Sequence, residues 1–165
     1  MIVKAIINED FTDYKKPSMF IACPRCNMKC GAEYCQNNPL LKESDHDIDD
    51  DKIIKDYLDN NLTQAIVFGG LEPMDSKDLW FFILKLRREY HCYDDVVIYT
   101  GYTEEELENP PSGLSKLFKL RQFPNIIVKF GRYIPNQKPH YDELLGVNLA
   151  SDNQYAKIIS PILNK

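Results

Sequence analysis

The sequence predicts an α/β fold, either a partial (β/α) barrel or an open, twisted, mostly parallel sheet with flanking helices. Apolar runs of strand length alternate with segments whose apolar residues recur at helical spacing. Such alternation pairs the strands in parallel through right-handed crossovers and covers both faces of the sheet. A complete eight-unit barrel usually takes about 250 residues. The 165 residues therefore predict one domain, residues 1–165, with room for only part of a barrel.

The first half of the chain predicts two strands, a helix and a third strand. Residues 2–7 and 18–22 are short apolar runs, and the second run ends at a group of cysteines. Between residues 50 and 60 the apolar side chains fall at helical spacing. Residues 64–68 then form a buried strand, which a pair of glycines is expected to stop.

The second half repeats this alternation. Residues 76–88 contain apolar positions at i, i+3, i+4 and i+7, which is the spacing of an amphipathic helix. The elements expected after it are a strand at 96–99, a capped helix start at 103–107, a short helix at 114–120 and a strand at 125–129. Beyond residue 132 the pattern weakens.

Ligands of open α/β sheets gather at the carboxyl ends of the strands. Four segments follow the predicted strands, and they are polar, contain glycine or carry cysteines. They are residues 23–37, 69–73, 100–102 and 130–132. We therefore expect these four segments to converge on one rim of the sheet.

Four of the five cysteines, Cys23, Cys26, Cys30 and Cys35, lie within thirteen residues, separated by two, three and four residues. We call residues 23–37 the cluster loop. Loops this short bring thiolates close together, which favours a metal site or an iron-sulfur cluster. Disulfide scaffolds are usually short, secreted and supplied with an even number of cysteines. This chain is 44% hydrophobic and has an odd number of cysteines, so it does not fit that class.

The composition gives no general reason to bind nucleic acid or membrane. The net charge is −5 and the pI is near 5.2. The apolar start at residues 2–7 is too short for a secretory signal, and no apolar run approaches membrane length. The sequence therefore predicts a protein of the reducing cytoplasm.

The cysteines of the cluster loop are compatible with either a zinc site or an iron-sulfur cluster. Four thiolates complete a tetrahedral zinc shell, which would make the chain a non-enzymatic interaction module that binds zinc through four cysteines. Three thiolates would instead leave one iron of a four-iron cluster open to a ligand. Zinc usually staples a module that lacks its own core, whereas this loop follows a sizeable predicted sheet, and this favours iron and sulfide. Cys23 is then either a fourth ligand or a spare thiol.

Five segments, in order, resemble the radical S-adenosylmethionine (SAM) superfamily, and in particular the activating proteins of anaerobic ribonucleotide reductase. The stretch C-N-M-K-C followed by C-Q-N, at residues 26–37, resembles the three-cysteine loop of that superfamily. The sequence G-G-L-E-P at 69–73 resembles its Gly-Gly-Glu-Pro strand end. Residues 98–102, 131–134 and 151–154 resemble later segments of the activating proteins.

The resemblance implies an enzyme that activates a glycyl-radical enzyme. Cys26, Cys30 and Cys35 would hold three irons of a [4Fe-4S] cluster, and S-adenosyl-L-methionine would chelate the fourth. One electron from the cluster would cleave the cofactor to methionine and a 5′-deoxyadenosyl radical, which removes a hydrogen from glycine. The implied partners are the large subunit of an anaerobic ribonucleotide reductase and a reductant such as flavodoxin or ferredoxin.

The resemblance also implies a set of residues that contact S-adenosylmethionine. Gly69 and Gly70 would let the backbone approach the methionine amino group, and Lys129 would pair with its carboxylate. The full set is Asn37, Gly69, Gly70, Glu72, Tyr99, Thr100, Lys129 and Asn153. Glu72 would alternatively organise the turn, and Lys129 would alternatively reach solvent.

Two features depart from the family pattern. The family loop separates its cysteines by three and then two residues, whereas here four residues separate Cys30 from Cys35. Leu71 is an insertion in the strand-end motif. Such departures suit a divergent branch, so the alternative enzyme is a radical SAM protein that modifies another protein or peptide.

Overall fold

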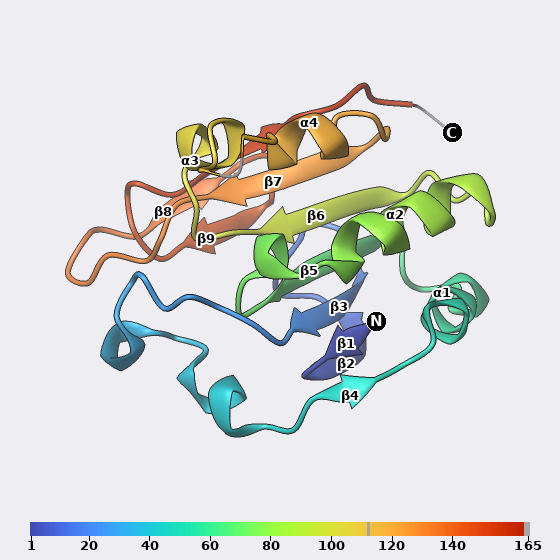
Figure 1. Cartoon of the computed structure of the whole chain (residues 1–165), viewed down its shortest axis with the longest axis horizontal. Coiled ribbons are helices and arrows are strands. Elements are labelled where there is room, and N and C mark those ends of the chain that lie inside the picture. Colours follow the sequence, from blue (N-terminus) through green and yellow to red (C-terminus); the bar gives the residue numbers. More distant parts are fainter. Residues whose placement is uncertain (112, 164–165) are drawn as a thin grey trace.

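The computed structural model describes residues 1–111 and 113–163, and its centre is a six-stranded sheet. The strand order is β10-β7-β6-β5-β3-β2, and Figure 1 shows β7, β6, β5 and β3 side by side in this order. The bounds are β2 Ala5–Asp10, β3 Ser18–Cys23, β5 Ala65–Gly70, β6 Asp95–Tyr99, β7 Ile126–Phe130 and β10 Tyr155–Ile158.

The four inner strands β3, β5, β6 and β7 are parallel, and the edge strands β2 and β10 are antiparallel to their neighbours. Four parallel strands joined through helices confirm the predicted α/β class. The sheet stays open, because in the described part of the chain β2 and β10 form its two edges without pairing to each other.

Helices cover one face of the sheet. Their bounds are α1 Asp50–Asp59, α2 Asp78–Arg88, α3 Glu104–Glu108 and α4 Lys116–Leu120. Apolar side chains of all four pack against alternate strand residues such as Phe68, Ile98 and Val128. The Phe68 and Phe82 rings meet edge to face at 5.5 Å. This layer forms the larger of the two cores.

The other face is covered by chain that is not helical. Residues 11–17, which join β2 to β3, pack there with the hairpin of β8 His140–Asp142 and β9 Val147–Leu149. The Tyr14 hydroxyl donates to Asp95 at 2.9 Å, and the Lys15 N–H donates to the Leu145 carbonyl at 2.7 Å. These contacts fasten both segments to the sheet.

Short elements lie around this framework. Two short 3-10 helices lie near the cysteines: η1 Ala32–Tyr34 lies between Cys30 and Cys35, and η2 Asn38–Lys42 follows Cys35. A third, η3 Pro73–Asp75, follows β5. In Figure 1 the chain after β3 swings outside the sheet before it returns at β4. No helix among the described residues is both long and apolar enough to cross a membrane.

The structure corrects several predicted element bounds. The first strand is broken, because β1 Ile2–Val3 pairs with β4 His46–Asp47 and β2 begins only at Ala5. The short helix α4 begins at Lys116, because the Ser115 hydroxyl accepts the Phe118 N–H at 3.0 Å and caps it.

The glycine pair and the end of the chain also differ from prediction. Gly69 and Gly70 do not stop β5 but form its last two residues, paired with Ala22 and Cys23. The strands β8, β9 and β10 were not predicted, since each spans at most four residues.

Candidate functional site

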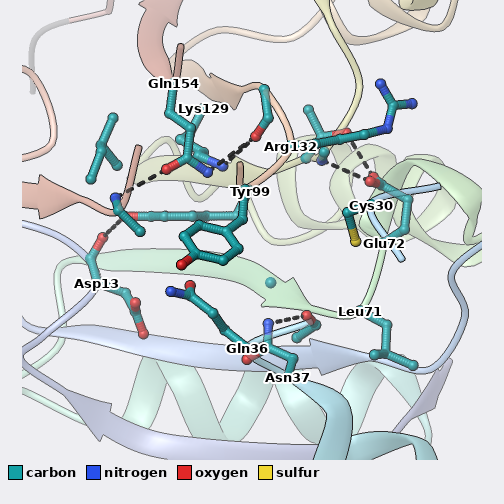
Figure 2. A pocket seen from close by; sticks show the side chains of 18 of the residues that line it. Asp13, Cys30, Gln36, Asn37, Leu71, Glu72, Tyr99, Lys129, Arg132 and Gln154 are labelled. Carbon is teal, nitrogen blue, oxygen red and sulfur yellow. Dashed lines mark hydrogen bonds between the residues drawn. The ribbon is translucent and has the colours of Figure 1, made fainter. Parts of the chain in front are cut away.

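A cavity of about 340 Å³ opens at the carboxyl ends of the parallel strands, on the face covered by residues 11–17 and the β8–β9 hairpin. The four segments expected to converge on one rim all line it. Residues named for the site that line it are Cys26, Cys30, Cys35, Asn37, Gly69, Gly70, Glu72, Tyr99, Thr100 and Lys129. Figure 2 shows side chains from these segments facing one another across the cavity.

Three thiols of the cluster loop share one wall of the cavity. Cys26, Cys30 and Cys35 are each half-buried. Burial raises the pKa of Cys26, although the Met28 N–H donates to its Sγ at 3.3 Å. Burial also raises the pKa of Cys30, and a hydrogen bond with the Cys35 thiol adds to that rise. Binding a metal therefore displaces protons from this wall.

The three thiols do not converge on one point. Among the residues that the structure describes, no three His, Cys, Asp or Glu side chains are grouped closely enough to hold a metal ion. In an iron-sulfur cluster each thiolate binds its own iron, so its ligands surround a body rather than a single ion.

Cys23 lies elsewhere. It is the last residue of β3, its exposed fraction is 0%, and its side chain packs in the core under the helices. It does not line the cavity. The Leu71 N–H donates to the Cys23 carbonyl at 3.2 Å, so the extra residue after the two glycines is tied to the backbone of β3. None of the five cysteines, all of them described, forms a disulfide.

Side-chain hydrogen bonds hold the cluster loop against the sheet. The Asn37 amide donates to the Gly70 carbonyl, and the Asn27 amide donates to the Tyr102 hydroxyl at 2.5 Å. The Tyr102 hydroxyl in turn donates to Asp75 at 2.9 Å. Asn37 therefore fastens the loop to the end of β5, and its expected contact with a cofactor stays a prediction.

Tyr102 is also surrounded by cations. The side chains of Lys29, Lys116 and Arg132 each lie within 5.7 Å of its ring centre, which suits cation–π attraction. Arg132 makes a bidentate ion pair with Glu106 at 2.8 and 3.0 Å. The guanidinium holds the pKa of Glu106 at about 2. This network joins the cluster loop, the ends of β6 and β7, and α3.

The two glycines are required by close packing of β5 on β3. A Cβ on Gly69 would lie 2.7 Å from the Phe20 ring, and one on Gly70 would lie 2.9 Å from the Ala22 Cα. Gly70 also has φ +78°, which disfavours other residues. Packing against β3 therefore requires both glycines, and the close approach of a ligand to their backbone stays a prediction.

Glu72 joins the ends of two strands. Its carboxylate accepts from the Thr100 hydroxyl at 2.7 Å, the Gly101 N–H at 2.8 Å and the Met74 N–H at 3.0 Å. The side chain is buried, and burial raises its pKa although the three donors oppose the rise. Glu72 thus organises the turn, the alternative role that the sequence offered.

Lys129 brings a buried amine to the cavity. The residue is only 7% exposed, and its Nζ donates to the Gly131 carbonyl at 2.8 Å. Burial lowers the pKa of Lys129 to about 8, against the opposing effect of Glu72. Tyr99 is its register partner on β6, with the ring centre 5.9 Å from Nζ. Lys129 therefore does not reach out to bulk solvent.

Asn153 is set back from the cavity. Its amide donates to the Arg132 carbonyl at 2.9 Å, and it packs against Gly131. Its Oδ1 is buried without a hydrogen-bond partner in the described part of the chain. Asn153 thus supports the turn after β7 and does not line the space itself.

Several residues that line the cavity are not among the predicted site residues. Asp13 comes from the segment that joins β2 to β3, Gln36 from the cluster loop, and Arg132 and Gln154 from the later segments. Arg132 and Gln154 belong to stretches that resemble the activating proteins. No motif marked Asp13, because it reaches the cavity only when residues 11–17 fold under the sheet.

Comparison with known families gives this site a chemistry. The profile of a family described as a 4Fe-4S single cluster domain matches residues 18–151, from the start of β3 to the segment just before β10. The chain belongs to the 4Fe-4S single cluster domain family. Searches of curated proteins and of solved structures found no match. Family membership makes this an iron-sulfur protein and favours the iron-sulfur cluster over the zinc alternative.

The residues of the cavity wall suit the cluster that the family implies. Thiolates are the ordinary ligands of a [4Fe-4S] cluster, and this 4Fe-4S domain presents three of them beside a cavity. The wall faces polar groups, among them the buried amine of Lys129. The donor set therefore fits an iron-sulfur cluster and leaves room for a further ligand.

Proposed function

We propose that this 4Fe-4S protein is a radical SAM activase that generates a glycyl radical on an anaerobic ribonucleoside-triphosphate reductase. The observation that carries the proposal is the shared cavity, which joins a wall of three thiols to all the residues expected to contact S-adenosylmethionine except Asn153. Three thiolates leave one iron of a four-iron cluster without a protein ligand. The cavity volume lies within the range of small-molecule sites, about 300 to 1,000 Å³.

Cys26, Cys30 and Cys35 would hold the cluster. When bound and reduced, it would supply the electron that cleaves S-adenosylmethionine to methionine and a 5′-deoxyadenosyl radical, and that radical would take a hydrogen atom from the target glycine. The protein contributes position and protection from water, because residues 11–17 and the β8–β9 hairpin close the face beneath the cavity.

The polar residues of the cavity would orient the cofactor. Lys129 would pair with the methionine carboxylate, and its position beside Tyr99 keeps the amine inside the cavity. The peptide groups of Gly69 and Gly70 would meet the methionine amino group. The Gly70 carbonyl has a second lone pair for this, since Asn37 uses only one.

The target follows from the same arrangement. Hydrogen removal requires the glycine to reach the 5′ carbon, so the partner must present a loop that enters the cavity. The ordered segments that resemble reductase activating proteins support the large subunit of that enzyme as the partner. A flavodoxin or ferredoxin would supply the electron.

Anaerobic reconstitution tests the proposal. The chain is loaded with iron and sulfide, and its electron paramagnetic resonance spectrum is recorded with and without S-adenosylmethionine. A change on adding the cofactor reports an open iron site. Adding the reductase and a reductant should then give a glycyl-radical signal and 5′-deoxyadenosine.

Other outcomes would decide against the proposal. A fully loaded cluster whose spectrum ignores S-adenosylmethionine would exclude the cofactor chemistry. Cofactor cleavage without a glycyl radical, but with a modified residue on another protein or peptide, would favour the second enzymatic hypothesis. Purification with one zinc per chain and no iron would restore the zinc-binding module.

A further inference from the structure

The cavity has a second end, away from the thiols. Thr12 and Asp13 line this end together with residues 147–150 of the β8–β9 hairpin and its exit. The Tyr99 hydroxyl donates to the Asp13 carbonyl at 2.5 Å and so fixes this backbone beneath β6. In Figure 2, Asp13 lies on the opposite side of the view from Cys30 and Glu72, with Tyr99 between them.

The carboxylate of Asp13 takes no part in the hydrogen bonds that shape its own turn. Its neighbour Asp10 accepts hydrogen bonds from the Thr12 N–H, the Thr12 hydroxyl and the Asp13 N–H, which shape the turn. Within residues 1–111 and 113–163, no group donates a hydrogen bond to the Asp13 carboxylate itself. Burial, together with the charge of Asp10, raises the pKa of Asp13 to about 6.

An ionised carboxylate is a pure acceptor with several lone pairs, so Asp13 needs donors from a ligand or water. If the proposed function holds, the methionine end of S-adenosylmethionine lies at the thiol wall and at Lys129. The adenosine end then extends toward Asp13. Its donors are the ribose 2′ and 3′ hydroxyls and the adenine 6-amino group.

The residues that line this far end indicate which of these donors Asp13 would bind. Val147 and Leu149 offer apolar surface to the flat adenine ring. The two ribose hydroxyls are adjacent and match the two oxygens of one carboxylate, the pairing that an acidic residue makes with ribose in dinucleotide sites. We propose that Asp13 binds the ribose hydroxyls of S-adenosylmethionine and makes the cavity selective for a ribonucleoside ligand; this inference rests on the proposed function.

The inference predicts a specific energetic coupling. Hydrogen bonds to a charged group are stronger than neutral ones, so loss of this contact should weaken binding about 10- to 100-fold. Removing the 2′ hydroxyl from the ligand and removing the carboxylate from the protein abolish the same contact. The two losses of binding free energy should therefore not be additive.

The test uses the cluster-loaded protein and isothermal titration with S-adenosylhomocysteine, its 2′-deoxy analogue and its analogue without the 6-amino group. The proteins are the natural chain, Asp13→Ala, Asp13→Asn and the exposed control Glu143→Gln. Equal iron content and circular dichroism spectra show that each variant is folded and loaded.

We expect the natural chain and Glu143→Gln to prefer the ribose ligand by about 10-fold or more. Asp13→Ala and Asp13→Asn should bind the ribose and 2′-deoxy ligands equally. An undiminished preference in both variants would overturn the inference and leave the proposed function intact. Loss of the preference for the 6-amino group instead would move Asp13 to adenine and also overturn it. Failure of the loaded natural chain to bind any of the three ligands would overturn both.

Discussion

The Glu72 carboxylate accepts a hydrogen bond of 2.7 Å from the Thr100 hydroxyl, and this bond crosses from the end of β5 to the end of β6. Both side chains are buried, at 4% and 1% exposure. The Tyr102 N–H also donates to the same hydroxyl at 3.1 Å. One buried contact therefore sets the relative position of two of the segments that line the cavity.

Replacing Thr100 by valine should destabilise the protein. The change keeps the shape but leaves the Glu72 oxygen and the Tyr102 N–H short of a partner, which costs about 1 to 3 kcal/mol. In a chain of this size each kcal/mol lowers the melting temperature by about 2 to 4 °C. Thr100→Ser, which keeps the hydroxyl, is the matched control. Equal melting temperatures for Thr100→Val and the natural chain would contradict the role given to this contact.

The cysteines should separate into two classes. Cys26→Ser, Cys30→Ser and Cys35→Ser each remove a thiol from the cavity wall, so anaerobic reconstitution should yield less iron than the roughly four per chain of a complete cluster. Cys23→Ala should retain the iron and only lower the melting temperature, because the residue lies in the core. Iron and sulfide analysis measures both classes. Loss of iron in Cys23→Ala alone would make Cys23 a ligand.

The sequence predicted the parallel part of the fold and the rim of the site well. The inner strands β3, β5, β6 and β7 are buried, so each one is a run of apolar residues in the sequence, separated from the next by a segment with helical spacing. Each strand end carries its own glycine, cysteine or polar residue, so the converging segments were visible too. Short strands such as β8 and β9 carry too few residues for a periodicity to be seen.

What the sequence missed depends on contacts between distant segments. Asp13 reaches the cavity because the antiparallel edge strand β2 turns its connection under the sheet. The sequence left the direction of Lys129 open. Lys129 lies two residues after Ile127 on β7, so the two side chains point to the same face of the sheet. Ile127 packs in the core on the face covered by residues 11–17 and the β8–β9 hairpin, and Lys129 therefore points to that face as well.

Tyr102→Phe should weaken the hold on the cluster loop. The hydroxyl receives the Asn27 amide hydrogen bond and donates to Asp75, so its removal breaks the link between loop and sheet while keeping the ring among its cations. We expect iron to leave the loaded variant several-fold faster when a chelator is added. Tyr141→Phe, at an exposed position, serves as the control. Equal release rates in the two variants would show that the link does not retain the loop.

Lys129→Met should weaken binding of ligands that carry a carboxylate. S-adenosylhomocysteine should bind about 10- to 100-fold more weakly, whereas 5′-methylthioadenosine, which lacks the amino-acid carboxylate, should bind almost unchanged. The same contact should depend on pH. The pKa of Lys129 is lowered to about 8, so its charge is lost as pH rises through 8. Affinity of the natural chain for S-adenosylhomocysteine should therefore decline above pH 8, and that decline should be absent in Lys129→Met. Calorimetric titrations at pH 7 and 9 measure both effects, and equal losses for the two ligands would exclude the carboxylate contact.

Asp13→Asn should stabilise the protein in the absence of cofactor. The pKa of Asp13 is raised from 3.8 to about 6, so the folded state binds the proton more tightly than the unfolded state does. Stability contributed at this site is therefore lost as pH rises from about 4 to 6, and the loss persists at pH 7. Asparagine removes the charge, and after allowance for partial exposure the gain should be about 1 kcal/mol at pH 7.

Denaturant unfolding of the cluster-free chain at pH 4 and pH 7 measures the effect. The gain from Asp13→Asn should be present at pH 7 and nearly absent at pH 4, where the natural carboxylate is already protonated in the folded state. Glu143→Gln is the control, because Glu143 is exposed and lies in the β8–β9 hairpin. Its effect on the free energy of unfolding should be the same at pH 4 and pH 7. A gain at pH 7 alongside weaker cofactor binding would mean that Asp13 is retained for its ligand at the expense of stability, as expected of a functional residue. A loss of stability would instead make Asp13 part of the framework that holds residues 11–17.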